Sequence, residues 1–309
     1  MPVRYRPKAD VATKSSHLHC SAMSRVMIIA AFAATLFTAS AAMAQSARPV
    51  AGDQHHIVVS YQTTEESSDG STSSASGHDT MLERVIAVGD LGIELEYDLP
   101  ADTTAEDRAR TWKYPARVFL PTDGPQRLLN APELDARLDR WLASAGWSRD
   151  VCGSWIFTWS AFLVECDPAS VLAEIEAISL LSVEIADGAA YAHPGTLGPA
   201  ALARSSNAPH GALTAVLKLD GNAIRRSRAE SDVAVGEMMQ QPVTLEQALL
   251  KRSTEQVSGT VEVTFEVDQA GRPTRRTAVT TFEIVGADGV TETHRSTITV
   301  ERRPVLRAK

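Results

Sequence analysis

Three histidines stand close together early in the chain. His55 and His56 are adjacent, and His78 follows across a Ser-rich stretch. Three imidazoles in one place could bind a metal ion such as zinc. Neighbouring residues of a strand point to opposite faces, however, so His55 and His56 cannot share one ion without local distortion. We favour separate surface histidines and expect no metal, and we interpret His193 and His210 as polar loop residues rather than catalytic bases.

A row of carboxylates is the second candidate for chemistry. Glu94, Glu96 and Asp98 alternate with apolar residues. Such a row could bind a cation or, if desolvated, supply a general acid and base. Antiparallel sheets commonly leave one face wet, which explains the row with fewer assumptions. We therefore interpret it as the solvated face of a strand.

Arginines form the main basic spots: Arg225, Arg226, Arg228, Arg275 and Arg276. Guanidinium groups bind carboxylates and phosphates through paired hydrogen bonds, so these residues could hold an anionic ligand or an acidic partner. Ion pairing with the many acidic residues is the alternative that we favour.

Cys152 and Cys166 are separated by fourteen residue steps. That distance spans about 46 Å as a strand or about 21 Å as a helix, whereas bridged Cα atoms lie within about 7 Å. A disulfide therefore requires the segment to reverse direction. A redox-active pair would be expected as C-x-x-C, so we predict a structural disulfide worth about 3 kcal/mol.

The densest aromatic cluster lies between these cysteines. Trp155, Phe157 and Trp159 alternate with other residues, which predicts a strand, a reversal near residues 160–161 and a returning strand that includes Phe162. The four aromatic side chains either pack as core or line an apolar ligand cavity. They are the candidate ligand-binding residues.

Short catalytic and cofactor motifs are missing from the sequence. It contains no G-x-S-x-G, S-x-x-K, H-E-x-x-H, C-x-x-C, P-loop or G-x-G-x-x-G pattern. We therefore assign no catalytic residue and expect no cofactor. A hydrolase with dispersed catalytic residues stays open, because many hydrolase sites have no local signature.

The elements that would position these residues begin with a β-meander. Strands are predicted at 56–62, 81–88 and 93–99, the last with a clear period of two. The Ser-rich stretch 63–79 between the first two strands is too polar to pack, and we interpret it as a mobile hairpin loop.

Helical spacing marks the middle of the chain. Helices are predicted from Thr103 or Thr104 to Trp112, from Asn130 to Gly146, from Asp167 to Ile178 and from Thr244 to Lys251. Strands are predicted at 181–186 and 212–219, each closed by an Asp-Gly turn, at 187–188 and 220–221.

Three long strands end the chain, at 261–267, 277–285 and 291–301. Antiparallel β-meanders thus stand at both ends of a helical middle segment, whose one-sided apolar stripes suit packing on the sheet. This pattern predicts the α+β class.

The N-terminal part is typical of a secretory leader. Arg25, the apolar run 26–37 and Ala42-Met43-Ala44 match the three regions of a signal peptide over 23–44. We expect cleavage after Ala44, a periplasmic location, and a start at either Met1 or Met23. The apolar run is shorter than the roughly 20 residues that span a bilayer. The remainder, 45–304, is expected to be one α+β domain with a short tail at 305–309.

Removal of the leader takes away five basic residues and one acidic residue, which leaves 25 basic and 37 acidic residues and a formal net charge of −12. An acidic surface repels nucleic acid phosphates and anionic lipid headgroups. Nucleic acid is therefore excluded as a main partner, and no transmembrane segment is expected after the leader.

The C-terminal strands carry a resemblance. Ser258 to Asp268, the turn Gly271-Arg272-Pro273 and two further polar–apolar strands resemble LolA/LppX-like periplasmic carrier half-barrels over 257–301. The start of this run is also similar to a TonB C-terminal domain, but there a helix follows where this chain continues as strand. The carrier resemblance implies a curved antiparallel sheet around an apolar cavity covered by helices.

Together these observations favour a non-enzymatic periplasmic protein that binds a lipid-like, apolar or amphiphilic ligand, or an envelope protein partner. A periplasmic hydrolase is the alternative and predicts a polar cleft where a histidine meets a carboxylate or a hydroxyl. A structural envelope protein with an interaction surface on the arginines is the third hypothesis.

Overall fold

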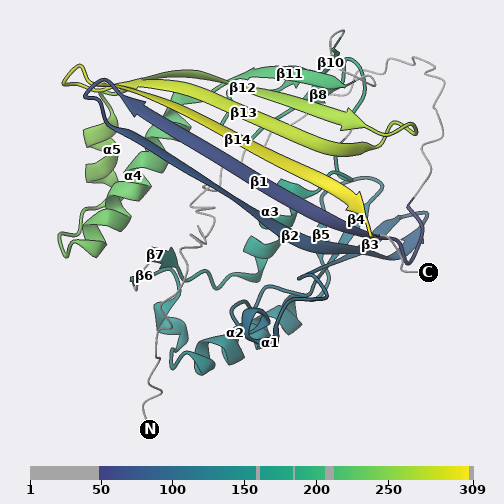
Figure 1. The fold of residues 1–309 in the computed structure, drawn as a ribbon. Coiled ribbons are helices and arrows are strands. Elements are labelled where there is room, and N and C mark those ends of the chain that lie inside the picture. The colour runs from purple at the N-terminus through teal and green to yellow at the C-terminus, as the bar shows by residue number, and fades with distance from the viewer. Residues whose placement is uncertain (1–48, 158–160, 184, 206–211, 306–309) are drawn as a thin grey trace.

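A ten-stranded antiparallel sheet dominates the computed structural model, which describes residues 49–157, 161–183, 185–205 and 212–305 (Figure 1). The strand order is β10-β11-β12-β13-β14-β1-β2-β3-β4-β5, so the last long strand pairs with the first. The strands are β1 (Gln54–Ser67), β2 (Thr72–Gly89), β3 (Gly92–Asp98), β4 (Ala116–Pro121), β5 (Arg127–Leu128), β10 (Ala203–Arg204), β11 (Leu213–Lys218), β12 (Gln256–Val267), β13 (Pro273–Val285) and β14 (Thr291–Pro304).

Five helices accompany the sheet in the described residues, and they lie on one side of it in Figure 1. The α+β class predicted from the sequence is therefore confirmed. The helices are α1 (Ala105–Arg108), α2 (Ala131–Ser144), α3 (Pro168–Ile178), α4 (Gly221–Met238) and α5 (Leu245–Arg252), with a 3₁₀ turn at Arg149–Val151. Two small hairpins complete the fold: β6 (Trp155–Phe157) with β7 (Ala161–Leu163), and β8 (Ala190–Tyr191) with β9 (Ala200–Ala201).

The Ser-rich stretch is strand, not a mobile loop, so that prediction is wrong. β1 and β2 stay paired up to Glu66 and Thr72, and only 68–71 form the turn. β14 pairs along the other edge of β1 as far as Ser67. Both edges of this polar strand thus gain ladder hydrogen bonds, which outweigh its weak intrinsic preference for a strand.

Helix starts follow their predicted caps in three places. The side chains of Thr104 and Asp167 accept hydrogen bonds from backbone N–H groups of α1 and α3, and Thr244 forms a full capping box with Gln247. Asn130 precedes α2 but instead accepts from the Arg117 backbone N–H at 2.9 Å. The side-chain amide of Asn130 therefore links the start of α2 to β4.

Other boundaries differ from the prediction. The first helix ends at Arg108 rather than Trp112, because Trp112 is buried in the core instead of continuing the helix. Asp220 caps α4 and does not close a hairpin turn. The described residues of 181–186 form no strand; Leu181 packs against one core and Val183 against the other, so this segment crosses between them.

Two hydrophobic cores lie on the sheet. The first joins β1–β4 to α2 and α3 and includes Ile57, Leu95, Val118, Leu138 and Ile175. The second joins β11–β13 to the segment around β8 and β9 and is built on residues such as Tyr191, Leu202, Leu217, Val263 and Phe265. β14 and β1 connect the two halves through continuous pairing, so one sheet carries both cores.

Candidate functional site

A pocket of about 670 Å³ lies where the crossing segment passes the ends of β2, β3 and β4. Its wall combines the β2–β3 turn, the loop that follows β4, α3 and the start of the crossing segment. The lining residues are Pro49, Val88, Gly89, Asp90, Gly92, Ile93, Leu120, Pro121, Thr122, Gly124, Pro125, Gln126, Glu176, Leu181, Ser182 and Val183.

Apolar side chains form one part of the wall. Ile93 and Leu120 face the pocket from paired positions of β3 and β4, and both pack against the first core. Leu181 and Val183 come from the crossing segment. Ligand pockets of this size are commonly lined by apolar groups with a few fixed polar ones, so the wall suits an apolar chain.

Close backbone approach shapes the mouth of the pocket. Gly92 has φ +151°, and a Cβ at this position would lie 2.3 Å from the Leu120 backbone oxygen. Thr122 fixes the neighbouring turn, because its backbone N–H donates to Leu91 at 3.0 Å and its hydroxyl donates to the Asp90 backbone oxygen at 3.1 Å. The polar groups of this turn are therefore held in place before any ligand arrives.

Gln126 contributes a buried polar atom. The residue is only 8% exposed, and its Oε1 makes no hydrogen bond with any residue that the structure describes. An unpaired buried acceptor costs about 1–3 kcal/mol, so native proteins rarely keep one without a partner. A donor supplied by a ligand in the adjoining pocket would satisfy it.

Two carboxylates complete the polar part of the pocket. Glu176 stands on the exposed side of α3, and partial desolvation raises the pKa of its carboxyl group. Asp90 lies in the β2–β3 turn. The described lining contains no lysine, arginine or histidine, so its charged groups are all acidic.

The predicted aromatic site lies elsewhere. β6 and β7 form the expected hairpin, and the Cys152–Cys166 disulfide is confirmed with a Cα–Cα distance of 5.5 Å. Trp155 is half-buried, whereas Phe162 is exposed and contacts the ring of Trp147 at 6.3 Å. Phe157 lies in β6, and Trp159 falls outside the described residues. Trp155 and Phe162 do not line the pocket, and the role of the four aromatic residues in binding stays a prediction.

The histidines do not converge. His55 and His56 take alternate positions of β1, and His78 pairs with Ser60 further along the same strand. Among the described residues, no group of three His, Cys, Asp or Glu side chains could hold a metal ion.

His55 belongs instead to a buried polar network. Arg302 donates to Glu83 Oε1 at 2.8 Å and to His55 Nδ1 at 2.9 Å, and Tyr97 donates to Glu83 Oε2 at 2.9 Å. Glu83 and Tyr97 are fully buried. Burial raises the pKa of Tyr97, so the phenol stays protonated, and burial with the charge of Arg302 lowers the pKa of His55 to about 4.

A second hollow of about 670 Å³ borders this network and is lined by Asp53, Gln54, His55, Arg272, Pro304 and Val305. It is the polar site in which a histidine meets a carboxylate, as the hydrolase alternative requires. His55 uses Nδ1 as an acceptor for Arg302. No serine, threonine or cysteine lines the described part of this hollow, so it lacks a nucleophile for His55 to activate.

Ion pairing accounts for the carboxylate row. Glu94 pairs with Arg117, and Glu96 accepts from Arg84 at 2.6 Å. Asp98 accepts from Arg108 at 2.9 Å. The row is therefore partly shielded and neutralised by arginines, which leaves it poorly suited to bind a cation.

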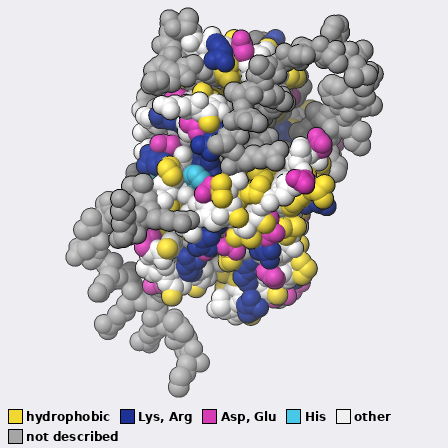
Figure 2. Space-filling model, turned by 90° about the vertical axis from the view of Figure 1, so that its right-hand side faces the viewer, with side chains coloured by type: hydrophobic (Ala, Val, Ile, Leu, Met, Phe, Trp, Pro, Cys, Tyr) yellow, Lys and Arg dark blue, Asp and Glu magenta, His cyan; other side chains and the backbone are white. Residues whose placement is uncertain are grey.

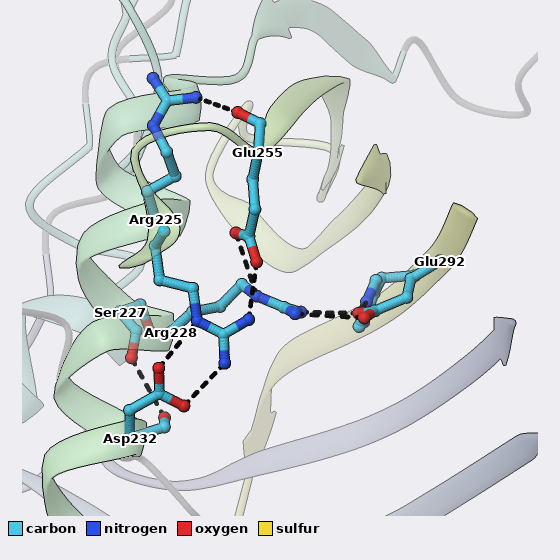
Figure 3. A network of polar contacts seen from close by, with 9 residues as sticks. Arg225, Ser227, Arg228, Asp232, Glu255 and Glu292 are labelled. Carbon is cyan, nitrogen blue, oxygen red and sulfur yellow. Dashed lines mark hydrogen bonds and ion pairs between the residues drawn. The ribbon is translucent and has the colours of Figure 1, made fainter. Parts of the chain in front are cut away.

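The arginines of α4 also have partners (Figure 3). Arg228 makes two hydrogen bonds to Glu292 of β14, at 2.7 and 3.2 Å, and lies 3.4 Å from Glu255 Oε2. Arg225 donates to the Glu255 backbone oxygen at 2.9 Å. Arg226 pairs with Glu230, Arg275 with Glu266, and Arg276 donates to the Ala177 backbone oxygen. The contacts of Arg228 and Arg225 attach α4 to β14 and to the start of β12, and all five arginines of the predicted anion site are engaged with protein groups.

Charge is mixed on the face that Figure 2 draws. Basic and acidic side chains alternate there, with hydrophobic groups between them. The described side chains that are visible on this face form no large patch of one charge. In addition, no helix in the described ranges is long and apolar enough to cross a membrane.

No protein family matches the chain, and no curated protein matches it. A solved structure described as lipid–protein interactions in lipovitellin aligns over 84% of this chain, with 9% identity and a TM-score of 0.37. The alignment covers 26% of that structure, so this chain spans about a quarter of its length. The ywiB protein from Bacillus subtilis aligns over 80% of this chain and 92% of its own, with 10% identity and a TM-score of 0.16. These TM-scores are too low for function to be inferred.

Sequence reasoning missed the residues that matter most here. Gln126 stands in a loop with no periodic pattern, and Glu83 is one charged residue in a strand that has several others. Glu83 and Tyr97 do share a signal, because both occupy positions where the alternation of their strands predicts an inward side chain. A charged residue at an inward position indicates a buried polar network.

Proposed function

We propose that the protein is exported and binds an apolar or amphiphilic small molecule in the pocket between β2–β4, α3 and the crossing segment. The observation that carries this proposal is the unpaired, buried oxygen of Gln126 in a pocket with an apolar wall. An apolar chain would gain free energy from burial against Ile93, Leu120 and Leu181, at about 25 cal/mol per Å².

Binding is favoured over hydrolysis by the chemistry of the two hollows. The pocket next to Gln126 contains hydroxyl groups and carboxylates but no histidine among its described lining residues. The hollow next to His55 contains the histidine, without a hydroxyl or thiol in its described lining. Neither described lining therefore joins a side-chain hydroxyl or thiol to a histidine, which is the arrangement of Ser–His and Cys–His hydrolases.

An oxidising compartment fits the remaining features. The leader pattern over 23–44 lies outside the described residues, but the Cys152–Cys166 disulfide belongs to the kind of bond that persists in the periplasm or outside the cell. The proposed setting is the periplasm, after cleavage at Ala44.

The test is native mass spectrometry of the full chain, expressed with its own leader and recovered gently from the periplasm. We expect an N-terminus at Gln45 and a co-purified ligand with the mass of a small amphiphile. Val88→Trp places a large ring in the pocket from a residue that is 37% exposed, and this variant should lose the bound mass.

Val216→Trp is the matched control, since Val216 is 62% exposed on β11 and does not line the pocket. It should retain the ligand. Bare protein from the wild-type chain, or equal ligand in both variants, would contradict binding in this pocket.

A further inference from the structure

The polar groups around the pocket differ from those expected at a site that binds a carboxylate or a phosphate. Its charged side chains are Asp90 and Glu176, and its one unpaired buried polar atom is the acceptor Oε1 of Gln126. A carboxylate or phosphate ligand would bring more negative charge to these groups and leave Oε1 without a donor.

Nearby arginines do not offset this charge in the described structure. Arg127, which follows Gln126, lies with its guanidinium carbon 5.0 Å from the centre of the Phe119 ring. Arg117 is engaged with Glu94 on β3. The pocket therefore presents a negative surface at its polar side and an apolar surface at the other.

A bare metal ion fits this site poorly. Calcium takes six to eight oxygen ligands at about 2.3–2.6 Å, and magnesium needs a tight octahedral set. The pocket offers two carboxylates around a volume of about 670 Å³ and a wall that is partly apolar. A larger cation that carries its own apolar surface matches both parts.

We propose that the pocket selects a long-chain primary ammonium, with the ammonium group donating to Gln126 Oε1 and facing the carboxylates of Glu176 and Asp90. The alkyl chain would lie along Ile93, Leu120, Leu181 and Val183. An ammonium group has three donors and no acceptor, so it matches three acceptor groups of the pocket, Gln126 Oε1 and the carboxylates of Glu176 and Asp90. This assignment rests on the proposed binding function and names the ligand class of the same pocket.

The test uses three probes with the same twelve-carbon chain: dodecylammonium, dodecanol and dodecanoate. Each is titrated below its micellar concentration, by calorimetry at pH 7, into the disulfide-bonded protein recovered from the periplasm. Dodecylammonium should bind about tenfold more tightly than dodecanol, because hydrogen bonds to charged groups contribute about 1.5–3 kcal/mol. Dodecanoate should bind most weakly.

Variants separate the two polar contacts. Glu176→Gln should weaken dodecylammonium about tenfold and leave dodecanol unchanged, whereas Gln126→Leu should weaken both, since each donates to Oε1. Glu174→Gln is the matched control on α3: Glu174 pairs with Lys113 and does not line the pocket, so affinity should stay at the wild-type value.

The outcomes distinguish the ligand class from the function. Dodecanoate binding that equals or exceeds dodecylammonium binding, and that is lost in Val88→Trp, would overturn the ammonium assignment and leave amphiphile binding intact. Failure of all three probes to bind would overturn both. An equal loss in Glu174→Gln and Glu176→Gln would show that general surface charge attracts the ammonium, which would also overturn the assignment.

Discussion

Gln126 and Glu83 show two opposite ways in which a buried polar residue can be accommodated. Both oxygens of Glu83 accept hydrogen bonds, from Arg302 and Tyr97, so the folded protein already compensates for its desolvation. Gln126 Oε1 has no such donor among the described residues. The first arrangement holds strands together, and the second leaves a cost that a hydrogen-bond donor from a ligand would remove. This contrast is why we place the function at Gln126.

His55 gives the first prediction, which concerns pH. Its folded pKa of about 4 lies below the ordinary 6.5, so the unfolded chain binds this proton more tightly. Stability from this residue is therefore fully present above pH 6.5 and is lost as the pH falls towards 4. Between pH 7 and pH 5, His55→Gln should reduce the pH-dependent loss in the free energy of unfolding by about 1–2 kcal/mol.

Urea unfolding of both proteins at a series of pH values measures this effect. His78→Gln is the control, because His78 is exposed and should leave the pH profile unchanged. If the free energy of unfolding changed with pH in the same way in wild type and His55→Gln, His55 would not be held neutral by burial next to Arg302.

At the scale of elements, the α4–α5 hairpin depends on charge more than on apolar packing. The buried residues of α4 are Ala229, Ala234 and Gly236, and α5 buries only Ala248. Larger contributions come from Arg252, which pairs with Asp232 and Glu255, and from Arg228, which reaches Glu292 on the sheet (Figure 3). Glu255 is 8% exposed, so these pairs are weakly screened by solvent.

The second prediction follows from this docking. Arg228→Met should weaken the attachment of α4 and α5 by about 2 kcal/mol, because Glu292 and Glu255 lose a guanidinium partner in a partly buried site. Amides of the two helices should then exchange hydrogen about 30-fold faster at pH 7, while β13 and β14 stay protected. Hydrogen-exchange mass spectrometry measures both regions in one sample.

Arg226→Met removes an exposed pair with Glu230 on the same helix and is the control, with an expected effect of about 0.5 kcal/mol or less.

Low pH should weaken the attachment of α4 and α5 in the same way as Arg228→Met does. Hydrogen bonds from Arg228 lower the pKa of Glu292, and those from Arg252 lower the pKa of Asp232. Their contribution is present above the ordinary carboxyl pKa and is lost as the pH falls through the lowered folded values. If hydrogen exchange in Arg228→Met rose equally in the two helices and in β13 and β14, the result would contradict the prediction that α4 and α5 are attached by this contact.

The same elements show what the sequence could and could not predict. The alternation in β12 became a buried and an exposed face, whereas β13 and β14 show no such regular pattern of burial. Helix α4 was missed because small residues and arginines form its contact face, which leaves no apolar stripe to detect. β1 was cut short because its polar half gains stability from neighbours on both edges, and the Ser-rich half of β2 was cut short although it pairs with β1. The disulfide was predictable from two cysteines in a chain with a predicted export signal, whereas Gln126 could not be distinguished before its surroundings were known.

At the scale of the whole molecule, one sheet supports two cores that share few side chains. The first core occupies β1–β4 and the second β11–β13, with β14 between them in continuous register. The crossing segment contributes Leu181 to the first core and Val183 to the second, and the pocket includes both residues. The proposed ligand site therefore lies where the two halves meet, and its shape depends on their staying together.

The last prediction tests whether the halves unfold as one. All five tryptophans fall within residues 112–159, and three of them, Trp112, Trp141 and Trp147, belong to or pack against the first core. Leu217→Ala makes a cavity in the second core and should destabilise the protein by about 2–5 kcal/mol. If the β12–β13–β14–β1 ladder couples the cores, tryptophan fluorescence will report the lower midpoint although none of the described tryptophans belongs to the second core.

Urea unfolding followed by fluorescence and by far-UV circular dichroism should then give coincident transitions in wild type and variant alike. Val216→Ala on the same strand removes methyl groups from a side chain that is 62% exposed, and it should leave both midpoints within experimental error of wild type. Independent cores would instead give a two-step dichroism curve with an unchanged fluorescence midpoint. In that case the pocket would join two separately folding units, and a bound ligand would have to stabilise their interface, which a larger ligand-induced shift of the dichroism transition would reveal.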